Sequence, residues 1–316
     1  MRIFQRVLRI LFLLAGIAAG IITGIAAFFA KRMIRPPRQP LWLSPDTIGL
    51  PFENVNFPAQ DGVRLSGWFI PAVNASKRER ATIVLVHGWP WNRLGESATD
   101  LISTLSHAEP VDLMRLALAL HQHDYHVLMF DLRNHGESAE RTPVMFGLQE
   151  ARDLLGALAY LASRDDVNAE KIGVIGFSMG ANTLLYTLPY TEQIKAGIAV
   201  QPTTPSVFAE GFSRYMLGGL AKLVLPLAEM MYVAAGGIRL REFRPAAAAA
   251  GAGDTPLLFI QGEGDSWGCV EDVDGMAMAA PAGSEAIVVE GGHRFDGYQY
   301  LLDHPELAVG FFEENL

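Results

Sequence analysis

The sequence has a single cysteine, Cys269, which excludes an internal disulfide and therefore a disulfide-stapled secreted scaffold. It is also poor in charge, because 19% of its 316 residues are charged and 50% are hydrophobic. A disordered chain would show the opposite balance. Outside residues 1–40, basic side chains are scarce, with 18 Lys and Arg against 34 Asp and Glu. A body this acidic lacks the positive surface that nucleic acids require, so nucleic-acid binding is excluded.

Near the amino terminus, residues 10–30 form a run of 21 residues without a charged side chain. An apolar helix of about 20 residues spans the hydrocarbon core of a bilayer. A cleaved signal peptide is the alternative, but its apolar core is shorter, about 7–15 residues. Basic residues flank the run on both sides: Arg2, Arg6, Arg9, Lys31, Arg32, Arg35 and Arg38. We expect residues 1–40 to form a single-pass membrane anchor and basic tether. Because the numbers of basic residues on the two sides of the run are nearly equal, the orientation of the anchor stays open.

Within the predicted anchor, Gly16, Gly20 and Gly24 are spaced by four residues. On a helix they form a smooth strip that lets a second helix approach closely. Homodimerisation through this strip is one hypothesis. The other is that glycine is simply common in membrane helices.

Residues 41–316 alternate short apolar runs with helix-like segments. We predict eight strands at 54–58, 63–70, 82–86, 126–130, 172–177, 194–200, 256–260 and 285–289. Helices are expected at 111–122, 149–162, 181–188, 270–279 and 298–314. This alternation predicts one α/β domain with a mostly parallel sheet, antiparallel in its first two strands and covered by helices on both faces.

Residues 202–254, between the sixth and seventh predicted strands, are too many for a plain crossover. Their central part, 216–235, is apolar enough for a second membrane span. However, Lys222, Pro226 and Glu229 lie inside it, and charges at membrane depth are costly. We therefore expect a helical insertion, or cap, that packs over the edge of the sheet.

The pentapeptide Gly176-Phe177-Ser178-Met179-Gly180 lies where a predicted strand passes directly into a helix. This is the G-x-S-x-G pattern in the strand–turn–helix context that it requires. Such a sharp reversal strains the apex residue, and the residues two positions away on each side must lack bulk. The start of the helix favours negative charge at the same point. The motif therefore predicts Ser178 as a nucleophile.

A serine hydroxyl is a weak nucleophile and needs a base, which a third group must orient. In this arrangement the acid and then the histidine follow the serine along the chain. Asp265 lies just after the strand predicted at 256–260, and His293 just after the strand at 285–289. Both leave the carboxyl ends of strands, at the edge where Ser178 emerges, so we predict a Ser178–His293–Asp265 triad.

Two other acids compete with Asp265. Glu263 shares its loop and is the stronger competitor, and Asp272 follows a few residues later. We prefer Asp265 because four residues after the predicted strand leave room for the chain to turn back.

Acyl transfer also needs N–H donors aimed at the developing oxyanion. The residue after the nucleophile, Met179, should supply one. The second should come from the loop after the third strand, His87-Gly88-Trp89-Pro90-Trp91. Proline has no N–H group, so we choose the backbone N–H of Trp89.

Over residues 51–316 these motifs resemble the α/β-hydrolase superfamily. The resemblance rests on His87-Gly88, the stretch 131–138 (D-x-R-x-H-G-x-S), the elbow 176–180, and the loops of Asp265 and His293. It implies that the 131–138 stretch shapes the loop beside the active site, so Arg133 and His135 are structural. The anchor and elbow are similar to those of membrane-anchored Bem46-like and YqkD-like hydrolases. Trp89-Pro90 and the segment 93–110 depart from that pattern and leave the shape of the pocket open.

We therefore predict a membrane-anchored serine hydrolase of the esterase or lipase type that cleaves a carboxylic ester or related acyl bond. This mechanism needs neither a metal nor an organic cofactor. A peptidase or thioesterase would use the same triad, and a non-catalytic, membrane-tethered protein of the same fold is a further alternative. Three tryptophans near the site, Trp89, Trp91 and Trp267, indicate a small-molecule or lipid-like acyl substrate. The side of the membrane stays open.

Overall fold

The computed structural model describes residues 2–316, so Met1 of the predicted anchor lies outside it. Its main sheet has eight strands in the order β1-β2-β6-β3-β7-β8-β9-β10. These are β1 (Glu53–Pro58), β2 (Arg64–Ile70), β3 (Thr82–Val86), β6 (His126–Phe130), β7 (Ile172–Phe177), β8 (Ile194–Val200), β9 (Leu257–Gly262) and β10 (Glu285–Val289). Strand β2 pairs antiparallel with both neighbours, and the other pairs are parallel. The predicted eight-stranded, mostly parallel sheet is confirmed.

Helices cover both faces of this sheet. On one face lie α3 (Leu113–Gln122), α10 (Asp296–Asp303) and α11 (Pro305–Asn315), and on the other α4 (Ala151–Ala162), α5 (Met179–Thr187), α8 (Pro245–Ala249) and α9 (Val270–Ala279). The strands serve both cores by alternation, because Val84 and Val86 of β3 point into one core and Ile83 and Leu85 into the other. Burial on both faces explains why the strands are continuous apolar runs.

Several small elements were absent from the sequence prediction. They are a two-stranded sheet of β4 (Gly95–Glu96) and β5 (Val111–Asp112), the helix α2 (Leu101–Leu105), and short 3₁₀ turns at Pro45–Ile48, Ala75–Arg78, Leu188–Tyr190, Gly218–Leu220 and Leu240–Glu242. The single helix predicted at 298–314 is wrong, because α10 ends at Asp303 and α11 begins at Pro305, with His304 between them. Proline disfavours a helical conformation in the residue before it and has no N–H group to continue the ladder.

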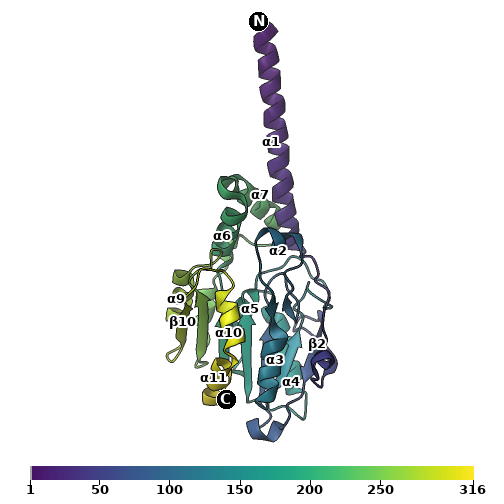
Figure 1. Cartoon of the computed structure of the whole chain (residues 1–316), viewed down its shortest axis with the longest axis vertical. Helices are drawn as coiled ribbons and strands as arrows, with labels where there is room; N and C mark the ends of the chain where they lie inside the picture. The colour runs from purple at the N-terminus through teal and green to yellow at the C-terminus, as the bar shows by residue number, and fades with distance from the viewer. Residues whose placement is uncertain (1) are drawn as a thin grey trace.

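The insertion after β8 contains two longer helices, α6 (Pro205–Leu217) and α7 (Ala221–Ala234), joined by a turn at Gly218–Leu220. Glu229, which sequence analysis weighed against a membrane span, accepts the backbone N–H of Leu240 at 2.8 Å. We call α6, α7 and this turn the cap hairpin. Figure 1 shows it at the end of the body from which the long amino-terminal helix emerges.

That amino-terminal helix is α1 (Arg2–Ile34), and α7 packs along its carboxyl-terminal part. Small side chains make the contact close: Ala26 and Ala30 of α1 are buried against Val224 and Ala228 of α7. From Phe4 to Gly24, α1 is largely exposed (Figure 1). Phe4–Ile34 is long and apolar enough to cross a membrane, a test that a signal sequence would also pass. The stretch Pro205–Ala234 passes it too, but the turn at Gly218–Leu220 divides it into two helices.

Candidate active site

The elbow between β7 and α5 holds Ser178 in a strained backbone conformation, with φ 52° and ψ −114°. Its two glycines are sterically required. A methyl group on Gly176 would collide with the carbonyl of Gly180, and one on Gly180 would collide with the carbonyl of Val86. The N–H of Ser178 donates to the carbonyl of Val200 at 2.9 Å, which ties the elbow to the end of β8. The strain is therefore held by packing on both neighbouring strands.

Two backbone N–H groups beside this serine have no partner. Within the described chain, the N–H groups of Trp89 and Met179 donate to no protein acceptor. Both residues line the small cavity that also contains Ser178. They are close because the loop after β3 packs against the start of α5, so that a methyl on Gly180 would also lie 2.6 Å from the carbonyl of His87. Unpaired donors at a nucleophile are what an oxyanion hole requires.

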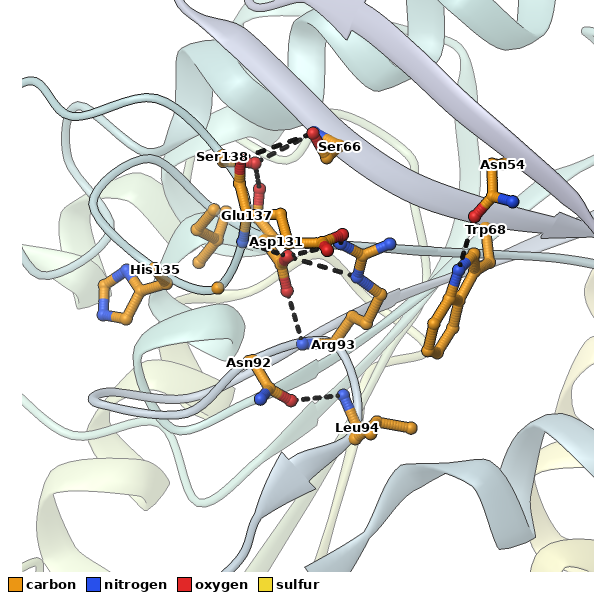
Figure 2. Close-up of polar contacts among 12 residues, drawn as sticks. Asn54, Ser66, Trp68, Asn92, Arg93, Leu94, Asp131, His135, Glu137 and Ser138 are labelled. Atoms are coloured by element: carbon orange, nitrogen blue, oxygen red, sulfur yellow. Dashed lines mark hydrogen bonds and ion pairs between the residues drawn. The ribbon is translucent and has the colours of Figure 1, made fainter. Parts of the chain in front are cut away.

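A buried ion pair fixes the loop that carries Trp89. Arg93, which sequence analysis did not single out, donates from Nη2 to Asp131 Oδ2 at 2.7 Å and to Glu137 Oε2 at 2.5 Å. Its backbone N–H donates to Asp131 Oδ1 at 2.8 Å. Figure 2 shows Asp131 at the centre, joining the loop after β3 to the loop after β6. Burial alone would raise the pKa of Asp131, but the charge and hydrogen bonds of Arg93 outweigh it and lower this pKa.

The Asp265 carboxylate is buried and receives four donors. Its Oδ2 accepts from Nε2 of Gln201 at 2.8 Å and of Gln261 at 3.4 Å. Its Oδ1 accepts from the backbone N–H of Trp267 at 3.0 Å and from Nη1 of Arg294 at 3.2 Å. Asp265 is thus held rigidly at the carboxyl edge of the sheet, but its charge is paired with Arg294.

The His293 ring points elsewhere. Its Nδ1 lies 3.5 Å from Oε1 of Glu109, and its side chain is 40% exposed. Among residues 2–316, neither Ser178 nor Asp265 makes a hydrogen bond with this ring. The backbones of the two loops nevertheless touch, because a methyl on Gly264 would lie 2.6 Å from the backbone nitrogen of His293. The structure therefore brings the loops together without joining the three side chains.

The competing acids have other surroundings. Glu263 is exposed. Asp272 accepts the backbone N–H of Thr204 at 2.7 Å and its hydroxyl at 2.8 Å, and so fastens the start of the insertion to α9. Of the three acids weighed from the sequence, Asp265 is the buried one at the rim.

The stretch 131–138 contributes packing and ion pairs. Nε of Arg133 donates to Oδ1 of Asp153 at 2.8 Å, and the rest of its guanidinium binds Asp61. The His135 ring lies edge-on to the ring of His87, 5.2 Å away between centroids. Burial, reinforced by His87, lowers the pKa of His135 to about 3, so this ring is neutral at physiological pH. Among residues 2–316, no group of three His, Cys, Asp or Glu side chains is arranged to hold a metal ion.

Comparisons with known proteins place this geometry in a family. The sequence profile of the alpha/beta hydrolase family matches residues 83–309. The uncharacterized protein YfhR of Salmonella typhimurium is 34% identical over 134 residues, which are 42% of this chain and 39% of YfhR, so the chain covers well under half of that relative. The uncharacterized protein MT2364 of Mycobacterium tuberculosis is 26% identical over 212 residues, or 63% of this chain and 67% of that protein.

Solved structures share the fold. The esterase Pf2001 of Pyrococcus furiosus superposes with a TM-score of 0.69 at 23% identity, covering 90% of this chain and 98% of the esterase. The alpha/beta hydrolase GrgF from Penicillium gives a TM-score of 0.62 at 18% identity, covering 84% and 99%. Because the family profile matches well over half of the sequence, the chain belongs to the alpha/beta hydrolase family.

Proposed function

We propose that the protein is a membrane-anchored serine hydrolase that cleaves a carboxylic ester or related acyl bond. The observation that carries this proposal is the strained Ser178, which shares its cavity with the unpaired N–H groups of Trp89 and Met179. A turn with only a structural role requires neither the strain nor two free donors. The esterases among its structural neighbours favour the same chemistry.

In the proposed mechanism the Ser178 hydroxyl oxygen attacks the substrate carbonyl while His293 accepts its proton. The N–H groups of Trp89 and Met179 bind the oxyanion, and loss of one such donor typically costs about 3–4 kcal/mol of transition-state stabilisation. His293 then gives its proton to the leaving group, and the acyl-enzyme remains. Water, deprotonated by His293, hydrolyses the acyl-enzyme and restores Ser178. Asp265 orients the imidazole and stabilises its protonated form.

This mechanism requires a local rearrangement. The His293 ring must leave Glu109, and Arg294 must release Oδ1 of Asp265. The chain before His293 permits such a rotation, because two glycines precede it and the second, Gly292, has open space around its Cβ position. Burial also raises the pKa of Tyr298, whose hydroxyl faces Ser178 and Arg294 and is therefore a donor at neutral pH.

A second candidate function follows from the same displaced histidine. A non-catalytic, membrane-tethered binding protein would have no need for His293 to approach Ser178, and the ring does point away from the site. Hydrolysis of a short ester distinguishes the hydrolase from the binding protein. We expect the full-length protein in detergent to hydrolyse p-nitrophenyl butyrate, and Ser178→Ala and His293→Ala each to lower kcat by about 10³-fold or more. His304→Ala, at the exposed junction of α10 and α11, should leave it unchanged. An inert wild type favours the binding protein, whereas equal activity in all variants overturns the catalytic roles proposed for Ser178 and His293.

The identity of the leaving group, in an ester, a thioester or an amide, is a separate proposal. A thioesterase or peptidase would use the same residues, so matched ester, thioester and amide substrates with one acyl group decide between them. We propose the ester because the neighbours whose names specify a bond include esterases, although an acylaminoacyl peptidase shares the fold as well. The anchor together with this elbow supports assignment to the Bem46-like subgroup.

Dimerisation through the anchor is a further part of the proposal. In the described chain, methyl groups on Gly16, Gly20 and Gly24 would meet nothing within 4 Å, so this strip is uncovered. A second α1 can therefore pack there. Gly20→Ile should weaken self-association of the detergent-solubilised chain, measured by analytical ultracentrifugation, whereas unchanged association removes this interface.

A further inference from the structure

We propose that a long acyl chain occupies an apolar cavity between the membrane helix α1 and the cap hairpin, and that the substrate enters this cavity from the bilayer. The inference rests on the proposed function and names its substrate class: a long-chain fatty acyl ester of the membrane. On this account α1 forms part of the binding site as well as being an anchor.

The cavity is lined from three helices. Phe29 and Met33 come from α1, Phe208 and Phe212 from α6, and Val224 and Ala228 from α7. Of the described residues that line it, Ser213 alone carries a hydroxyl group, and none carries a charge. A narrow space with such a lining suits a flexible hydrocarbon chain, because polar groups would lose their hydrogen bonds to water there.

This cavity is adjacent to the cavity of the proposed nucleophile. Four residues line both the apolar cavity and the cavity of Ser178: Trp89, Phe146, Pro205 and Phe208. The side chains between the two cavities are therefore apolar, and an acyl chain attached to Ser178 reaches toward α1 on this proposal by displacing them. This adjacency to Ser178 distinguishes the cavity from a void in the packing of the cap hairpin.

A second cavity on the other side of Trp89 and Phe208 fits the opposite end of the substrate. Aromatic and aliphatic side chains make up most of its lining, but, unlike the apolar cavity, it also contains four charged side chains, Arg32, Glu96, Asp100 and Arg294. Burial raises the pKa of Glu96, which lies among Gln39, Ala98 and Ser103. Hydrocarbon placed there would strip water from these groups, so the polar leaving group belongs on this side. The two cavities together fit an amphiphile.

The bilayer is the source of the substrate because the apolar cavity lies at the base of the candidate membrane span. Figure 1 shows the cap hairpin beside α1 at the end of the body where α1 emerges. The outer side of the hairpin carries exposed apolar side chains beside the exposed Lys222, with Leu220 49% exposed, Leu223 54% exposed and Met230 59% exposed. Exposed apolar side chains next to a membrane helix are suited to the lipid interface. On this proposal the substrate therefore reaches the cavity from lipid, along the contact between α1 and the cap hairpin.

Filling the cavity tests the inference. Ala228→Trp places an indole in the cavity, and Met230→Trp places one on the exposed side of the same helix. With the full-length protein in detergent micelles, we expect Ala228→Trp to lower the ratio of kcat/KM for p-nitrophenyl palmitate to that for p-nitrophenyl butyrate by about tenfold or more, equivalent to about 1.4 kcal/mol. Met230→Trp should keep the wild-type ratio. An unchanged ratio in Ala228→Trp overturns the inference.

A second measurement covers the case in which Ala228→Trp does not fold. The wild-type protein reacts with a hexadecyl fluorophosphonate that carries a photoreactive diazirine at the far end of its chain. We expect phosphonylation of Ser178 and, after illumination, cross-links to peptides of α1 or α7. Phosphonylation of Ser178 with cross-links confined to the 96–108 loop would overturn the acyl cavity and leave the proposed function standing. Absence of any phosphonylation would overturn both.

Discussion

Arg294 binds the carboxylate that the proposed mechanism assigns to the adjacent residue, His293. Nη1 of Arg294 lies 3.2 Å from Oδ1 of Asp265, and its guanidinium lies 3.8 Å from the ring centre of Trp267. Nδ1 of His293 instead lies 3.5 Å from Oε1 of Glu109. In the described conformation Asp265 is therefore paired with Arg294, and the proposed mechanism requires His293 to take its place.

Removing the ion pair between Arg294 and Asp265 should therefore speed the proposed reaction of Ser178. We expect Arg294→Gln to speed the labelling of Ser178 by a small fluorophosphonate by about five- to tenfold, because Asp265 becomes free to orient His293. The matched control is Arg115→Gln, which removes an exposed pair with Asp303 and should not alter the rate. Slower labelling in Arg294→Gln would show that the arginine supports the site instead.

The buried pair of Arg93 and Asp131 should matter for stability. Removing one partner of a buried pair leaves an uncompensated charge, which typically costs about 3–5 kcal/mol. We expect Arg93→Ala to lower the free energy of unfolding in urea by about that amount, whereas Arg115→Ala should cost about 1 kcal/mol or less because its pair is exposed. Equal losses would contradict the role assigned to Arg93.

Arg93 should also affect the chemistry, because it positions the loop of Trp89. In Arg93→Lys the charge remains, but the two hydrogen bonds to Asp131 and the third to Glu137 cannot all form. We expect a fall in kcat larger than any change in KM for a short ester. A change in KM alone would argue against an effect on the oxyanion donors.

The elbow glycines offer a sharp comparison. Gly180 in α5 has no room for a methyl group, whereas Gly310 in α11 has nothing within 4 Å of its Cβ position. Gly310→Ala should stabilise the protein by about 0.5–1 kcal/mol through helix propensity. Gly180→Ala should destabilise it and slow fluorophosphonate labelling, since the methyl group forces the elbow away from Val86. Thermal unfolding of both variants checks this, and a neutral Gly180→Ala would refute the described elbow.

The buried His135 predicts a pH dependence of stability. Its pKa is about 3 in the folded protein and about 6.5 in an unfolded chain, so between these values only the unfolded chain binds the proton. The contribution of His135 to the free energy of unfolding is therefore complete above pH 6.5. It is lost as the pH falls below that value, at up to about 1.4 kcal/mol per pH unit.

Replacing this ring tests that slope. The groups around it are His87, Asp131, Arg38 and the carbonyl of Arg133. His135→Phe should have a shallower fall in unfolding free energy between pH 6.5 and pH 4 than the wild type. The slope should not vanish, because burial also lowers the pKa of His87. Parallel pH profiles of the two proteins would mean that His135 is not buried as described.

Much of the fold could be predicted from local pattern. The predicted strands 82–86, 126–130 and 172–177 coincide with β3, β6 and β7, because strands buried on both faces are short apolar runs with clear ends. Two-residue strands such as β4 and β5 are too short to show any periodicity, so they were missed.

The candidate site likewise has one part that could be predicted from the sequence and another that could not. The elbow at Ser178 is encoded by consecutive residues, so its geometry could be predicted. That Arg294 pairs with Asp265 while His293 lies near Glu109 could not be predicted, because Glu109 is distant from both loops in the sequence. The role of Arg93 depends on an acid 38 residues away, which no local motif marks.

The most direct test of the central claim is to identify the residue that a fluorophosphonate modifies in the full-length protein, by mass spectrometry of the digested adduct. The account predicts a single phosphonylated site at Ser178, absent in Ser178→Ala and formed at least about 100-fold more slowly in His293→Gln. Labelling that persists in Ser178→Ala, or a wild type that stays unmodified while a known serine hydrolase in the same tube reacts, would contradict it.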